Sequence, residues 1–123
     1  MKILIGLILI VLCHTASAEC RRPLLEPLFI ASTVAQLADY STTLSIARSN
    51  RRFSEQSYIT RKIIGNNPTT GRVQRYFMGR LLISGVIQCY APDPWNRIIL
   101  WGQTVTHGGA AIHNFNIGLR FSW

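Results

Sequence analysis

Residues 28–47 read LFIASTVAQLADYSTTLSIA and contain one formal charge, that of Asp39. A second stretch, residues 98–117, reads IILWGQTVTHGGAAIHNFNI and contains no formal charge. The chain as a whole is strongly basic, since its 123 residues carry 13 Lys and Arg against 5 Asp and Glu. A helix needs about 20 mostly apolar residues to cross a hydrocarbon core of roughly 30 Å. The two stretches therefore predict helices that lie in a membrane.

The N-terminus is typical of a secretory signal peptide. Lys2 supplies a positive charge, residues 3–13 form an apolar run, and Ala-Ser-Ala at 16–18 resembles a cleavage site. We expect residues 1–18 to be the signal peptide, with an uncleaved signal anchor as the alternative. Residues 19–123 then form a single helical membrane domain. Glu19 argues against a lipoprotein, because a small residue should precede a lipidated cysteine at Cys20.

Three helices are predicted in this domain, over residues 24–48, 72–90 and 98–117. Pro27 lies in the first turn of the first helix, where proline is tolerated. Arg75 and Arg80 interrupt the second helix, which either spans with both arginines directed to one interface or forms a buried or re-entrant helix. Glycines and alanines in the third helix suit close packing in lipid. The expected fold class is all-α: a signal peptide followed by three packed, transmembrane helices.

A polar loop, residues 49–71, joins the first two of these helices. Asn67-Pro68 and the flanking glycines are typical of a turn. Residues 54–64 allow a short amphipathic surface helix, and Thr70 is a candidate cap for the next helix.

The distribution of basic residues predicts the topology. Seven of the thirteen lie in or beside the loop: Arg48, Arg51, Arg52, Arg61, Lys62, Arg72 and Arg75. Basic loops stay on the cytoplasmic side, so we expect a bacterial inner-membrane protein whose mature N-terminus is periplasmic. The expected partner is the lipid bilayer, with another membrane protein or a second copy of the chain as further partners. Export and the apolar stretches argue against nucleic acid, despite the charge.

This topology places Cys20 and Cys89 at the same, outer face. An oxidising compartment there would let them form a disulfide. The alternative is an unpaired Cys89 that serves as a small core residue.

Asp39 is the residue that most needs a partner, because an ionisable group inside a membrane is costly. At about 1.5 Å per residue, His107 on the third helix comes to a similar depth. We expect an intramembrane polar pair between Asp39 and His107, with Gln36 and Thr43 satisfying the remaining hydrogen bonds.

Ser84 also lies near the middle of the predicted membrane. Ser84, His107 and Asp39 are therefore candidates for a catalytic triad. No Gly-x-Ser-x-Gly motif surrounds Ser84, and no catalytic residue is assigned. His107 and His113 are six residues apart and lie on different helix faces, so no metal site is expected, nor any cofactor.

The C-terminus carries a competing pattern. Apolar residues at 115, 117, 119, 121 and 123 alternate with polar residues or glycine, which is the period of a β-strand. This pattern resembles the C-terminal signal of outer-membrane β-barrels. It indicates either a small barrel or a strand-like tail on a helical protein.

Several short motifs occur in a recognisable order: Asp39-Tyr-Ser-Thr-Thr43, Glu55, Asn67-Pro68, and a glycine-rich last helix with His113-Asn114. This order resembles small bacterial and phage-encoded helical membrane proteins of unknown function. In that family the acidic residue lies nearly adjacent to Asn-Pro, whereas Glu55 lies twelve residues before Asn67. The resemblance implies helical membrane architecture and no particular mechanism.

The function expected from the sequence is a non-enzymatic interaction or accessory role for a small integral membrane protein of the envelope. Three alternatives stay open. These are an intramembrane hydrolase using Ser84, His107 and Asp39, a small outer-membrane β-barrel, and a pore-forming lysis protein whose helices line water with their polar faces.

Overall fold

The structure, a computed structural model, describes residues 20–49 and 58–123. These residues form four helices and no strand: α2 (Pro27–Arg48), α3 (Tyr58–Ile64), α4 (Thr70–Tyr90) and α5 (Trp95–Asn116). The predicted all-α class is therefore confirmed. The predicted signal peptide and Glu55 lie outside the described residues, as does the part of the loop at 50–57.

All three predicted helices start at a different residue in the structure, and the first begins at Pro27 instead of residue 24. The second long helix begins at Thr70, and its cap is Thr69 instead of Thr70, because the Thr69 hydroxyl accepts a hydrogen bond from the Arg72 N–H at 3.3 Å. The third begins at Trp95, directly after Pro94, a residue that suits a helix start because its missing N–H would have no helical partner.

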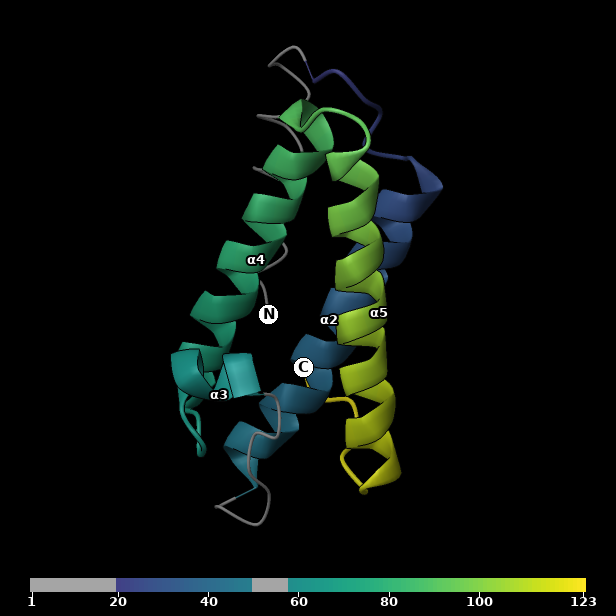
Figure 1. Cartoon of the computed structure of the whole chain (residues 1–123). Coiled ribbons are helices and arrows are strands. Elements are labelled where there is room, and N and C mark those ends of the chain that lie inside the picture. The colour runs from purple at the N-terminus through teal and green to yellow at the C-terminus, as the bar shows by residue number, and fades with distance from the viewer. Residues whose placement is uncertain (1–19, 50–57) are drawn as a thin grey trace.

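The central helix of the fold is α2, which packs against both α4 and α5. Figure 1 shows α2 and α5 running in the same direction, with α4 antiparallel to both. Contacts between α4 and α5 are few, and the two helices diverge from the turn that joins them. The short helix α3 packs against α4 near its N-terminal end.

Covalent and polar links hold the end of the molecule where α4 turns into α5. Cys20 and Cys89 form the expected disulfide, which joins the segment before α2 to the end of α4. Arg22 pairs with Asp93 at 3.1 Å and also donates to the carbonyl of Ala91. These contacts fix the chain entering α2 to the turn between α4 and α5.

The predicted strand-like tail is not found in the described C-terminal residues. The helix α5 continues to Asn116 and stops where Gly118 adopts a positive φ of 99°. The Leu119 N–H then bonds to the Asn114 carbonyl at 3.0 Å, the pattern of a glycine-terminated helix. The last residues fold back onto α2, where the Ser41 hydroxyl accepts from the Ser122 N–H at 2.7 Å. The alternation therefore belongs to a helix end and a coil.

The interior is unusually polar. Among the described residues, buried apolar side chains form one small cluster, made of Tyr40, Leu44, Ile64, Val73 and Phe77. Many large apolar side chains are instead exposed, among them Val34, Ile83, Trp101, Val105 and Ile112. Within the described ranges, no helix combines the length and the mean hydropathy that a membrane crossing requires.

The disulfide gives a first prediction. We expect Cys20→Ser combined with Cys89→Ser to lower the free energy of unfolding by about 4 kcal/mol, because the bond closes a long loop and restricts the unfolded chain. Thermal unfolding followed by far-UV circular dichroism measures the change. The wild type measured with a reducing agent is the control and should melt like the double variant. An unchanged melting temperature in the double variant would contradict the prediction.

Candidate functional site

Polar contacts connect α2 to α5 at three levels, which we call the polar ladder. Its pairs are Ser32–Gln103 at 3.1 Å, Asp39–His107 at 2.5 Å and Thr42–Asn114 at 3.1 Å. All six side chains are buried. Residue numbers rise together along both helices, as they must when the two helices are parallel. The ladder fixes the register of α5 along α2, because a shift by one turn would leave several buried polar groups without partners.

Asp39 and His107 form the middle level and are 6% and 3% exposed. The His107 Nδ1 lies 2.5 Å from Asp39 Oδ2, and the Thr43 hydroxyl donates to Asp39 Oδ1 at 3.2 Å. The ring of Phe77 packs edge-on against the imidazole. Asp39 therefore sets the orientation of the His107 ring and leaves Nε2 as the nitrogen available for another contact.

The structure thus brings Asp39 and His107 together and adds Thr43, as the sequence led us to expect. Gln36 was expected beside this pair but lies elsewhere. Its amide nitrogen donates to the Ser84 hydroxyl at 2.9 Å and also lies 3.3 Å from the Ser32 hydroxyl. Because Gln36 precedes Asp39 by almost one helical turn, it meets α4 and α5 at the next level of the interior.

Ser84 is not part of a triad with His107 in the described structure. Its hydroxyl oxygen lies 3.0 Å from Gln103 Oε1 and 2.9 Å from its own helix carbonyl at Arg80. It also accepts from Gln36. The Nε2 atom of His107, which would have to receive the serine proton, is buried and has no partner among the described residues. Ser84 is a member of a hydrogen-bonded cluster with Gln36, Ser32 and Gln103.

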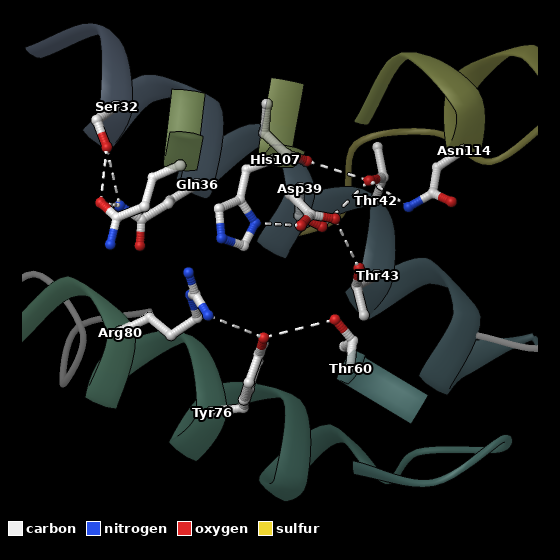
Figure 2. Close-up of polar contacts among 12 residues, drawn as sticks. Ser32, Gln36, Asp39, Thr42, Thr43, Thr60, Tyr76, Arg80, His107 and Asn114 are labelled. Carbon is white, nitrogen blue, oxygen red and sulfur yellow. Dashed lines mark hydrogen bonds and ion pairs between the residues drawn. The ribbon is translucent and has the colours of Figure 1, made fainter. Parts of the chain in front are cut away.

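A pocket of about 320 Å³ opens beside the Asp39–His107 pair. It lies between α3, α4 and α5, and its polar lining consists of Asp39, Thr60, Tyr76, Arg80, Gln103, Thr106 and His107. Ile59, Ile99, Gly102 and Ala110 supply the remaining wall. Figure 2 shows Tyr76 and Arg80 extending from α4 into the space below His107.

The guanidinium group of Arg80 is only partly used by the protein. Its Nη1 donates to the Tyr76 hydroxyl at 3.4 Å, and that hydroxyl lies 3.5 Å from the Thr60 hydroxyl. Its Nε is buried and has no hydrogen-bond partner in the described part of the chain. No carboxylate among the described residues lies within ion-pair distance of Arg80. Arg80 therefore places a charged guanidinium group beside the pocket, and at least one of its N–H donors has no acceptor among the described residues.

Sequence reasoning identified Asp39 and His107 but missed what Arg80 does. Arg80 was treated as an interruption of the second helix, with its side chain directed to an interface, whereas it points inward. The available signal was its isolation, since no other charged residue lies between Arg75 and Asp93. His113 is exposed and Asn114 is buried, and the described residues contain no cluster of three or more potential metal ligands.

A scan against protein-family models gave no match, and neither did searches of curated proteins and of solved structures. The resemblance to small helical membrane proteins of bacteria and phages stays a prediction.

The ladder predicts a large effect of Asp39→Ala. This change leaves His107 Nδ1 and the Thr43 hydroxyl without their buried acceptor, so we expect a loss of about 3 to 5 kcal/mol in the free energy of unfolding. Thr104→Ala is the control, because Thr104 bonds only to its own helix carbonyl at Leu100, and it should cost under about 1 kcal/mol. Denaturant unfolding of the purified proteins measures both. Equal losses in the two variants would contradict the prediction that the Asp39–His107 contact stabilises the fold more than an ordinary hydrogen bond.

Proposed function

We propose that the chain is a small integral protein of the bacterial envelope, with its helices in the inner membrane and a non-enzymatic interaction or accessory role. The observation that carries the proposal is the distribution of polarity between the interior and the surface. This distribution compares the outward-facing side chains of each helix with its buried ones. The mean hydropathy of a whole helix averages over both faces.

The two faces of α5 carry the argument most clearly. Four of its six buried positions are polar, namely Asn96, Gln103, His107 and Asn114, and the other two are Leu100 and Ala111. Its exposed positions include Ile98, Trp101, Val105 and Ile112, with exposures of 55%, 59%, 66% and 65%. A helix on the surface of a water-soluble protein has the opposite arrangement, with its apolar face toward the core. A lipid environment accounts for an apolar exterior around hydrogen-bonded polar groups.

The positions of the charged side chains support the same environment. Arg48, Arg72 and Arg75 lie at the end of α2 and the start of α4, whereas Arg22, Asp93 and Arg97 lie at the opposite end of the bundle. Between these ends, α5 has no charged residue from Ile98 onward. Its 22 residues extend for about 33 Å, close to the thickness of a hydrocarbon core.

The proposed orientation in the membrane rests on the basic residues at one end of the bundle. Arg48, Arg61, Lys62, Arg72 and Arg75 favour the cytoplasmic side for the end that carries α3. The disulfide at the opposite end then lies on the periplasmic side, where it can form. A role in interaction instead of hydrolysis is supported by the engagement of Ser84 with Gln36 and Gln103.

A lysine placed on the outward face tests the lipid environment. Val105→Lys lies midway along α5 at a well-exposed position, so it should be nearly neutral if the face meets water. In lipid we expect a cost of about 2.5 to 3.5 kcal/mol and a marked loss of protein from carbonate-washed membranes. Ile63→Lys is the control, because Ile63 is similarly exposed at 59% but lies in α3 beside Lys62. Equal membrane yields for both variants would refute the proposed environment.

Cysteine accessibility tests the orientation separately. In intact cells, a membrane-impermeant thiol reagent should label a cysteine at Asp93 and leave cysteines at Ser57 and Ser122 unlabelled, because only the first lies on the periplasmic side. Permeabilised cells, in which all three should react, provide the control. Labelling at Ser57 and Ser122 from outside, without labelling at Asp93, would reverse the orientation.

A further inference from the structure

We infer that the pocket between α3, α4 and α5 binds a phosphate group, with the Arg80 guanidinium as its principal contact and His107 Nε2 as the second. The inference concerns the chemistry of the pocket and does not require the helices to lie in lipid.

Two hydrogen-bonding atoms without partners in the described structure face this pocket. Arg80 Nε and His107 Nε2 are both buried and both lack partners among the described residues, and both side chains line the same pocket. Buried polar atoms are nearly always paired in native proteins, so two unpaired ones beside a common space indicate a missing ligand. His107 is 3% exposed and is held in place by Asp39, which gives the site a fixed geometry.

A phosphate group matches the hydrogen-bonding capacity of both atoms. A guanidinium group presents several N–H donors in a planar fork that matches the oxygens of a phosphate. With Nδ1 directed at Asp39, His107 Nε2 accepts a hydrogen bond when the ring is neutral and donates one when it is charged. A phosphate monoester offers both an O–H donor and anionic acceptors, so it satisfies either form. A carboxylate ligand would not satisfy the neutral ring.

The charge around the pocket and its volume also suit a phosphate group. The carboxylate of Asp39 also lines the pocket, but its two oxygens are occupied by His107 and Thr43. Arg61, Lys62 and Arg72 lie on α3 and at the start of α4, so the nearby end of the molecule attracts anions. A volume of about 320 Å³ exceeds the roughly 30 Å³ occupied by a water and lies at the lower end of small-molecule sites. Ile59, Ile99 and Ala110 can contact an apolar part of the ligand.

A phosphate group can arrive on a lipid or on a soluble ester, and four probes separate these sources. Purified full-length protein in detergent is titrated with phosphatidic acid and with diacylglycerol, which has the same acyl chains without the phosphate. The soluble pair is glycerol 3-phosphate and glycerol. The midpoint of thermal unfolding and the bound mass in native mass spectrometry are the readouts. We expect phosphatidic acid or glycerol 3-phosphate to bind and to raise the midpoint, and its phosphate-free partner to do neither.

Arg80→Gln should weaken binding of the active probe about tenfold or more, since a charge-assisted contact is lost. Arg75→Gln is the matched control, because it removes the same charge from an exposed position on the same helix and should change affinity less than about twofold. Arg80→Lys, which keeps the charge without the fork, should be intermediate and guards against a folding defect in Arg80→Gln. If all four probes act alike, or if Arg75→Gln weakens binding as much as Arg80→Gln, the site does not exist as described.

Discussion

The contact between Asp39 and His107 is the interaction on which the arrangement of the helices depends. Asp39 is an acid buried in the middle of the central helix, and a buried acid needs a partner of matching geometry. His107 supplies it from α5, and this contact sets the depth at which α5 lies against α2. Once this depth is set, Gln103 and Asn114 reach Ser32 and Thr42 at the levels before and after.

That arrangement has consequences on both sides of α5. On the inward face Gln103, His107 and Asn114 bond to α2, beside the buried Leu100 and Ala111. The outward face carries Ile98, Trp101, Val105 and Ile112. The proposed lipid environment follows from this outward face. On the side toward α4, helices α4 and α5 diverge and leave the pocket that is lined by Arg80 and His107 (Figures 1 and 2). The apolar outward face of α5 and the pocket therefore both result from the polar contacts that join α5 to α2.

Local signals predicted the elements that depend on local physics. Pro27 lies in the first turn of α2 as expected, because proline restricts its own backbone whatever surrounds it. The C-terminal alternation wrongly indicated a strand-like tail, because a period of two over a few residues does not show whether a helix has already ended. Gly118 decides that point: its positive φ terminates α5, and Leu119 is then buried instead of extending a strand.

The sequence by itself determined that the chain is helical, that Asp39 requires a buried partner near the depth of His107, and that Cys20 and Cys89 can meet. Each of these follows from residue type and spacing along one helix or between its ends. Only the tertiary structure decided that Ser84 bonds to Gln36 and Gln103, and that Arg80 turns inward to the pocket. These contacts depend on how far each helix is rotated about its axis, and that rotation results from the packing of all the helices together.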